Sequence, residues 1–422
     1  MLFFILLYLA LVLVRPQDYP ILASPLEVPW LQVSLGLAGL AWLISPRKRF
    51  DAPQYPLLAG FLLTVLVSEI VPPARWLGGA VDALSWFGPT VLAFLFLANA
   101  AVTEPAVRRT MWAFAVCTGV LALHGVLMSF TGTGWSGVPM VEGDRIQYVG
   151  IFSDPNDLGL LFATVLPMVV YASGRGGWLG LRRVFWFAVA ALIVWAIFLT
   201  RSRGALLAVA AMATVYVWRR RGLFLAAVFG SAGVFGITLL KSRLGEITSE
   251  DASAVGRLDA WYGGLLMFRE YPLFGVGAGN FSEHNPLTAH NSFVLVLAET
   301  GIVGYTLWLM FVGYTFWMMI TMVQHKPALE GPEAAASWAR WQAKALTLLL
   351  SLVAFFAAAF FLSRSYLVVL YLLAGLVVGC YTGARDEFPS LPRPNPMDMP
   401  LRWMAIVVGS IVGLWLITKV LL

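Results

Sequence analysis

The sequence predicts an all-α fold, a polytopic bundle of transmembrane helices. Of its 422 residues 60% are hydrophobic and 12% are charged, and the mean hydropathy is +0.81. Soluble globular domains do not have this balance. Apolar stretches recur along the chain at the length that crosses about 30 Å of hydrocarbon, and spans must be helical because backbone groups find no water there. We therefore expect one integral membrane domain, residues 1–422, surrounded by membrane lipid and without a nucleic-acid partner.

Thirteen apolar segments are candidate spans, and because the first is short and the last is weak, the sequence is compatible with twelve. They lie near residues 1–14, 30–45, 55–71, 81–99, 110–130, 157–173, 184–200, 204–218, 222–240, 302–323, 345–361, 365–382 and 402–420. The largest connection is the loop of residues 241–301, in which residues 253–268 have a pattern compatible with a helix.

The basic residues predict the orientation, because Lys and Arg accumulate in cytoplasmic loops. Seventeen of the 28 basic residues fall in six loops that alternate with the others along the chain. If those six loops are cytoplasmic, the loops 131–156, 201–203 and 241–301 face outward. Several arginines on the outward side then oppose the usual bias: Arg145, Arg201, Arg203, Arg257 and Arg364. A planar, permanently charged guanidinium suits phosphate oxygens, so these residues favour an anion site at the membrane surface. The alternative is that each pairs with a nearby acid.

Three of these outward arginines have a distinctive setting. Arg201 and Arg203 lie in a very short joint between two apolar segments, at the lipid–water boundary where a lipid-linked phosphate would lie. The alternative role is to stop the helices from sliding into the bilayer. Arg257 and Trp261 are four residues apart and share one face if their segment is helical. A guanidinium beside an indole holds a phosphate and a sugar ring, but it is also an ordinary packing pair.

His290 is the histidine best suited to chemistry. Asn291, Ser292 and an apolar run follow it, so it lies where an external loop enters a membrane helix. An imidazole with a pKa near 6.5 accepts a proton at neutral pH, which is what activation of a sugar hydroxyl requires. The alternative is a capping or loop histidine. His284 is six residues away across Pro286, a spacing that matches no established zinc pattern.

Two further motifs are interpreted structurally. The glycines of 275–279 follow Tyr271-Pro272-Leu273-Phe274 and not a strand, so a turn is favoured over a nucleotide loop. Asp154 precedes Pro155-Asn156 and is well placed as a helix N-cap, which we favour over a cation site shared with Asp157. No Asp-x-Asp pair occurs in the outward loops. This argues against metal-dependent glycosyl transfer.

The order and spacing of the motifs over roughly residues 145–320 resemble the O-antigen ligase and O-antigen polymerase superfamily of bacterial inner-membrane glycosyltransferases. The segment 15–18, Arg-Pro-Gln-Asp, is similar to members associated with exosortase systems. The motifs that carry the main resemblance are Phe152-Ser153-Asp154-Pro155-Asn156, Ser202-Arg203-Gly204, Gly256-Arg257 with Trp261, Pro272-Leu273-Phe274-Gly275-Val276-Gly277, and His290-Asn291-Ser292-Phe293 with Glu299-Thr300-Gly301 and Gly304.

The resemblance implies a C-type glycosyltransferase-like architecture of about twelve spans, with the loop 241–301 in the periplasm and carrying most of the catalytic motifs. It implies transfer of a glycan from undecaprenyl diphosphate, with inversion and without a metal or other cofactor. Within the ligase branch the acceptor is lipid A-core and the pathway is lipopolysaccharide biosynthesis at the inner membrane. Arg203 and Arg257 match the arginines thought to bind the donor diphosphate, and His290 matches the histidine thought to act on the acceptor hydroxyl. Further candidates for substrate binding are Arg201, Arg145, Asn156, Trp261 and Asn291.

Three alternatives stay open. A polymerase of the same superfamily uses the same donor, and a protein O-glycosylating ligase is equally compatible with the motifs. A transporter of lipid-linked glycan belongs to another class, and it predicts charged residues deep in several spans and internal repeats. The chemistry of the outward loops favours an enzyme.

Overall fold

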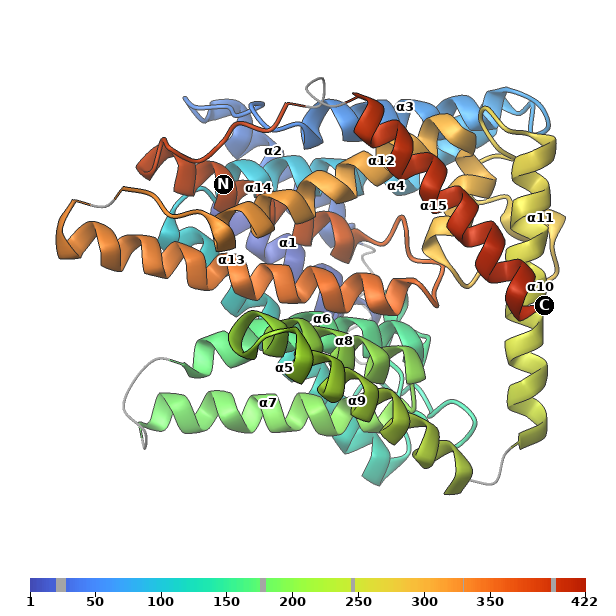
Figure 1. Ribbon diagram of the computed structural model, residues 1–422, viewed down its shortest axis with the longest axis horizontal. Coiled ribbons are helices and arrows are strands. Elements are labelled where there is room, and N and C mark those ends of the chain that lie inside the picture. The colour runs from blue at the N-terminus through green and yellow to red at the C-terminus, as the bar shows by residue number, and fades with distance from the viewer. Residues whose placement is uncertain (20–27, 175–179, 244–246, 329, 396–399) are drawn as a thin grey trace.

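The structure is a computed structural model that describes residues 1–19, 28–174, 180–243, 247–328, 330–395 and 400–422, without the side chains of residues 234–255. The described residues form fifteen α-helices and no β-strand. Most of the long helices run side by side, and one helix, α10, stands across their ends (Figure 1). The all-α polytopic fold class is therefore confirmed.

Each of the thirteen predicted apolar segments is a helix. Two more helices lie in the predicted large loop, α10 (Ile247–Glu270) and the one-turn α11 (Phe281–His284). The thirteen are α1 (Leu2–Val14), α2 (Trp30–Ile44), α3 (Gln54–Ile70), α4 (Leu77–Ala100), α5 (Glu104–Thr131), α6 (Pro155–Ser173), α7 (Leu181–Leu199), α8 (Arg203–Arg221), α9 (Leu223–Arg243), α12 (Ser292–Gln324), α13 (Gly331–Ala359), α14 (Val368–Glu387) and α15 (Pro400–Leu421).

Eight of the described helices are long and apolar enough to cross a membrane: α4, α5, α6, α7, α12, α13, α14 and α15. α2, α3 and residues 223–233 are apolar but shorter. The chain is thus a multi-pass membrane protein, and a total of twelve or thirteen spans stays a prediction.

The centre of the bundle is formed by α6 and α14, whose apolar windows are 83% and 89% buried. α14 approaches the C-terminal end of α4 closely because glycines recur on its contact face. A Cβ on Gly379 would lie 2.6 Å from the carbonyl oxygen of Ala101, and one on Gly383 would lie 2.0 Å from that of Val102. Small residues at every fourth position allow such contact between membrane helices. In contrast, α7 and α15 are 22% and 17% buried and lie at the periphery.

The alternation of loops between two ends, predicted from the basic residues, is confirmed by contacts. Loops assigned to the inward side meet one another through the ion pairs Arg49–Asp386, Arg385–Asp51 and Lys344–Glu104. Loops assigned to the outward side meet through the pairs Arg201–Asp144 and Arg364–Asp157 and the hydrogen bond from Asn280 to Glu69. The outward end carries α10, and the C-terminus lies beside this helix (Figure 1). That this end faces the periplasm stays an inference from charge.

α12 begins at Ser292, ten residues before the predicted start at 302. The glycine and the charge in Glu299-Thr300-Gly301 suggested a boundary, but the helix continues through them with a kink at Gly301, where φ is 61° and ψ is −163°. The predicted span thus lacked its first two to three turns. Those turns connect the outward loop to the bundle, so they also orient His290.

The glycines around position 275 form a turn, as predicted, and this turn packs on the kink of α12. The amide of Val276 donates to the carbonyl of Ala298 (3.0 Å), and the amide of Ile302 donates to that of Pro272 (2.8 Å). A Cβ on Gly275 would lie 2.3 Å from the carbonyl carbon of Glu299. Close backbone approach, and not ligand binding, explains this part of the glycine pattern.

Candidate functional site

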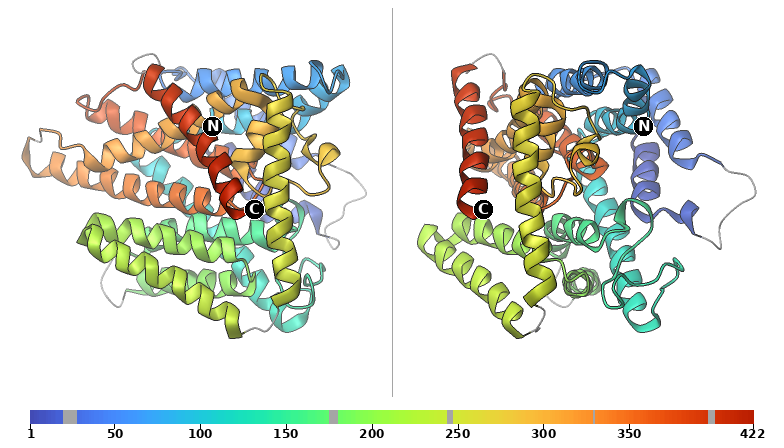
Figure 2. Two further views of the ribbon diagram at one scale, coloured as in Figure 1. Left: turned by 45° about the vertical axis from the view of Figure 1, so that its right-hand side comes forward. Right: turned by 90° about the vertical axis from the view of Figure 1, so that its right-hand side faces the viewer.

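The candidate site lies at the outward end, where segments far apart in the sequence meet. They are the start of α6, the α7–α8 joint, α10, the loop before α12 and the turn 360–367. Figure 2 shows α10 in front of the ends of the other long helices when this end faces the viewer. His290 and four of the outward arginines lie on these segments, and the fifth, Arg145, lies in the loop before α6.

His290 is fixed by the helix start that follows it. The Oδ1 atom of Asn291 accepts hydrogen bonds from the amides of Phe293 (2.9 Å) and Val294 (3.1 Å), which caps α12. His290 itself has a φ of 46°, in the left-handed region that few residues other than glycine adopt. Such strain persists only where the surroundings enforce it, and it is frequent at functional sites.

The half-buried imidazole of His290 has a lowered pKa. Burial is the main cause, the positive charges of Arg257 and Arg364 add to it, and Asp154 opposes it. His290 is therefore neutral at neutral pH and able to accept a proton. These influences also place two cations and one carboxylate within electrostatic reach of the ring.

The turn 360–367 holds the His290 segment on both sides. Before the histidine, the hydroxyls of Thr288 and Ser363 are 2.6 Å apart. After it, Ser292 Oγ donates to the carbonyl of Leu362 (2.6 Å) and accepts from the amide of Arg364 (2.9 Å). The carbonyl of Ser292 accepts from Ser365 Oγ at 2.7 Å. The position of His290 is thus linked to a loop about seventy residues later in the chain.

Arg364 in that turn forms a two-pronged pair with Asp157 in the first turn of α6. Its Nε donates to Oδ1 and its Nη2 to Oδ2 of the carboxylate, whose side chain is 4% exposed. The pair therefore accounts for Asp157, for which the alternative of a cation site with Asp154 had been open. Among the described residues no group of three or more His, Cys, Asp or Glu side chains is placed to hold a metal ion.

The predicted N-cap role of Asp154 is confirmed, since its side chain accepts from the amide of Asn156 at 2.7 Å. Asn156 also receives a hydrogen bond from Arg145 Nη2 at 3.2 Å. Arg145 Nε donates in turn to the carbonyl of Thr200 at 3.1 Å. Arg145 and Asn156 therefore tie the start of α6 to the end of α7.

Arg201 and Arg203 lie on the joint that follows Thr200. Arg201 pairs with Asp144 at 2.6 Å, and both side chains are about half exposed. Ser202 caps α8 by accepting from the amide of Ala205 (3.3 Å), which makes the half-buried Arg203 the first residue of the helix. A Cβ on Gly159 of α6 would lie 3.2 Å from Cβ of Ser202, so the joint packs directly on α6.

Arg257 of α10 has a buried Nε atom without a hydrogen-bond partner among the described residues. Burial lowers its pKa; the carboxylate of Asp154 opposes this effect, and Arg145 adds to it. Burying an N–H of a charged group without a hydrogen-bond partner costs free energy. An anion that accepted this hydrogen bond would offset the cost. Arg257 and His290 are also electrostatic neighbours.

The side chains of Trp261 and Asn291 are both buried, and both have packing or capping contacts in the structure. The indole of Trp261 is 4% exposed and packs edge-on against Phe360, with ring centroids 5.5 Å apart. It belongs to an apolar cluster with Val294 and Leu414. This favours the packing interpretation of the Arg257–Trp261 spacing. Asn291 is fully buried and caps α12.

Arg364 is predicted from the sequence as an outward arginine, but it is not among the predicted site residues. The signal that pointed to Arg201 and Arg203, an arginine in a short outward joint between two apolar segments, also applies to Arg364. Its partner Asp157 is 207 positions away, and no local pattern indicates that pairing.

Comparison with known proteins addresses the predicted resemblance. Residues 188–309 match the family model described as O-antigen ligase, and this segment runs from α7 into α12 and contains Arg203, Arg257 and His290. Comparison with curated proteins gives no match. The family match confirms the resemblance to the O-antigen ligase and polymerase superfamily, and it supports a function of that type in lipopolysaccharide biosynthesis.

Proposed function

We propose that the protein is a ligase of the O-antigen ligase and polymerase superfamily, whose family model residues 188–309 match. It transfers a glycan from undecaprenyl diphosphate to lipid A-core oligosaccharide on the periplasmic side of the inner membrane. The observation that carries the proposal is that a buried guanidinium N–H of Arg257, without a hydrogen-bond partner among the described residues, lies within electrostatic reach of the neutral imidazole of His290. The guanidinium can stabilise the negative charge of a departing diphosphate, and the imidazole can accept the proton of an attacking hydroxyl.

In the reaction we propose, the acceptor hydroxyl oxygen attacks the anomeric carbon of the donor glycan. The new C–O bond forms on the face opposite to the breaking bond, which inverts the configuration. His290 takes the hydroxyl proton, and the electron pair of the broken bond leaves with the diphosphate. Because His290 is neutral at neutral pH, it is in the form that accepts a proton.

Arg203 and Arg257 stabilise the negative charge that grows on the leaving diphosphate. Donors fixed in place before the reaction are most effective where water is excluded. Arg257 is half-buried and is held by α10, and Arg203 is half-buried at the start of α8. Neither arginine needs a metal ion for this role, in line with the metal-independent transfer that we propose.

The remaining outward residues shape the site. Arg145 and Asn156 join α6 to α7, and the Asp157–Arg364 pair joins α6 to the turn that holds His290. Arg201 is the residue among them best placed to contact a headgroup, because its pair with Asp144 is half exposed. Pairs of this kind contribute about 0–1 kcal/mol and exchange partners readily.

The experiment that tests the proposal offers one donor to three acceptors. Purified protein in nanodiscs receives undecaprenyl diphosphate glycan together with lipid A-core, a second lipid-linked repeat unit, or an unfolded periplasmic protein. We expect extension of lipid A-core. Extension of the repeat unit alone would identify a polymerase, and extension of the protein alone would identify a protein glycosylating ligase. Movement of donor across the membrane without any transfer would replace the enzyme by a transporter.

A further inference from the structure

The side chain of Asp154 has one carboxylate oxygen that the cap of α6 does not use. Asn156 donates both hydrogen bonds of the cap to Oδ1, from its amide at 2.7 Å and from its Nδ2 at 3.0 Å. The Asp154 side chain is half-buried and lies at the outward end, where the segments of the candidate site meet. Capping therefore occupies Oδ1 and leaves Oδ2 for another role.

The negative charge of Asp154 acts on His290 and on Arg257. Burial lowers the pKa of His290, the charges of Arg257 and Arg364 lower it further, and Asp154 opposes them. Burial also lowers the pKa of Arg257, and Asp154 opposes this effect as well. The charge of Arg364 is already matched by Asp157 in a two-pronged pair. Asp154 is therefore the carboxylate that balances positive charge on the imidazole.

Contacts at the outward end hold Asp154 and His290 in a fixed relation. Asp157, three residues after Asp154 in the first turn of α6, accepts two hydrogen bonds from the side chain of Arg364. The amide of Arg364 in turn donates to Ser292 Oγ at 2.9 Å, and Ser292 lies two residues after His290. The start of α6 is thus tied to the segment that carries the imidazole through a single residue of the turn 360–367.

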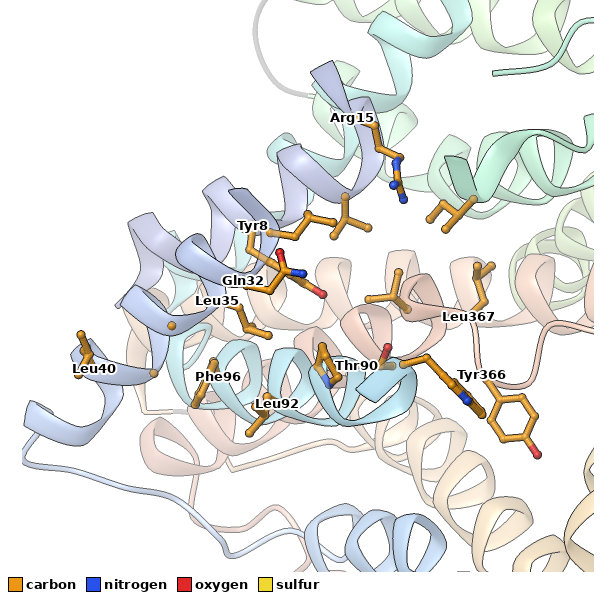
Figure 3. A pocket seen from close by; sticks show the side chains of 18 of the residues that line it. Tyr8, Arg15, Gln32, Leu35, Leu40, Thr90, Leu92, Phe96, Tyr366 and Leu367 are labelled. Atoms are coloured by element: carbon orange, nitrogen blue, oxygen red, sulfur yellow. The ribbon is translucent and has the colours of Figure 1, made fainter. Parts of the chain in front are cut away.

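The segment before α6 and the turn 360–367 also border one cavity, of about 650 Å³. Ile151, three residues before Asp154, lines this cavity, and so do Tyr366 and Leu367, the second and third residues after Arg364 (Figure 3). The ion pair and the shared cavity lining therefore agree. Both place the carboxylate and the imidazole on neighbouring segments of the outward end.

We propose that Asp154 is a positioning residue for the reaction, whose carboxylate stabilises the positive charge that His290 acquires from the acceptor proton. This inference rests on the proposed function. As the hydroxyl oxygen bonds to the anomeric carbon, its proton moves to a ring nitrogen of His290, and the ring becomes an imidazolium near two arginines. A nearby carboxylate favours this cation more than the neutral ring that precedes it, so it lowers the barrier. Water takes the proton from the imidazolium after the product leaves.

The same charge has the opposite effect on the donor. Asp154 is within electrostatic reach of Arg257, which we propose binds the departing diphosphate. Like charges repel, so a carboxylate at this place weakens the binding of a diphosphate before the reaction. Removing the charge should therefore slow the transfer of the proton without weakening donor binding. A residue that only caps α6 does not predict this combination.

The test removes the charge of Asp154 and keeps the cap. Asn and Ser cap helices about as well as Asp, so Asp154→Asn and Asp154→Ser preserve the start of α6. Glu283→Gln is the matched control, because Glu283 is an exposed acid of the same outward loop and is not among the charges that act on His290. Single-turnover transfer at saturating substrate and binding of undecaprenyl diphosphate are measured for each protein in nanodiscs.

A third measurement does not depend on transfer. Diethyl pyrocarbonate modifies the neutral imidazole, so its rate of reaction with His290 over a pH series, followed by mass spectrometry, gives the midpoint of protonation. The exposed His284 of the same loop is the internal reference. Its midpoint should be the same in all the proteins.

We expect Asp154→Asn and Asp154→Ser to move the midpoint of His290 to lower pH, because the carboxylate no longer favours the protonated ring. Transfer should fall about tenfold or more, within the roughly 100- to 10,000-fold that a general base contributes. Undecaprenyl diphosphate should bind equally well or more tightly, and Glu283→Gln should match wild type throughout. An unmoved midpoint or transfer at the wild-type rate would overturn the proposal. Loss of folding or of donor binding in both variants would also overturn it, because it would indicate a structural role.

Two outcomes separate this inference from the proposed function. An unmoved midpoint of His290 in Asp154→Asn, together with transfer by wild type, would refute the role of Asp154 alone. A midpoint moved to lower pH, together with no transfer by wild type to any acceptor, would refute the proposed function and support Asp154 as the residue that stabilises the imidazolium.

Discussion

Breaking the Asp157–Arg364 pair should destabilise the protein far more than breaking an exposed ion pair. Arg364→Gln leaves the Asp157 carboxylate, 4% exposed, without its cation. Removing one partner of a buried pair typically costs about 3–5 kcal/mol, and because the Arg364 side chain is 31% exposed we expect about 3 kcal/mol. The double variant Asp157→Asn with Arg364→Gln should recover part of this loss, since it buries no lone charge.

The assay is equilibrium unfolding of the two single variants and the double variant in mixed micelles, analysed as a double-mutant cycle. Arg49→Gln at the opposite end is the matched control. Its partner Asp386 is 53% exposed, so the loss should be at most about 1 kcal/mol. The reasoning is refuted if Arg364→Gln loses no more stability than Arg49→Gln, or if the losses of the two single variants simply add in the double variant.

Three further predictions concern the site and its support. The lowered pKa of His290 means that kcat/KM for transfer should fall on acidification only below pH 6.5, as the imidazole becomes protonated; an acid limb centred above pH 6.5 would contradict this. Arg257→Gln should raise the Kd for undecaprenyl diphosphate by roughly 10- to 100-fold, the value of a charged hydrogen bond, and an unchanged Kd in a direct binding assay would remove Arg257 from the donor site. Gly275→Ala and Gly301→Ala should each lower the free energy of unfolding by more than about 1 kcal/mol, because both positions have positive φ and no space, whereas Gly413→Ala in open space should not.

The helices could be predicted because hydrocarbon imposes them. Every long apolar run became a helix, and the alternation of basic loops correctly separated the two ends. The start of α12 was misplaced because its first turns contain Glu299, which is buried and accepts from the amide of Phe281 at 3.3 Å. The sequence does not distinguish a buried glutamate whose partner is 18 residues away from an exposed loop glutamate, so only this tertiary contact shows that the helix includes Glu299.

The candidate site was predictable in its cations but not in its supports. The outward arginines can be identified from the sequence because basic residues usually accumulate in cytoplasmic loops. His290 can be identified because Asn291, Ser292 and an apolar run follow it. The pairing of Arg364 with Asp157 depends on two segments 207 positions apart, which no local spacing encodes. The spacing of Arg257 and Trp261 is compatible with a substrate contact and with a packing pair, and in the structure the indole lies in an apolar cluster. Periodicity identifies a shared helix face but not what covers it.

The proposed reaction requires His290 to act at the acceptor hydroxyl and not to hold the donor. The decisive measurement compares His290→Ala with His284→Ala, a histidine of the same loop that is exposed and lies outside the proposed chemistry. Single-turnover transfer and binding of undecaprenyl diphosphate are measured for each. We predict that His290→Ala loses transfer by about 100-fold or more and keeps wild-type donor affinity, while His284→Ala is unchanged in both. Transfer at the wild-type rate by His290→Ala would contradict the central claim.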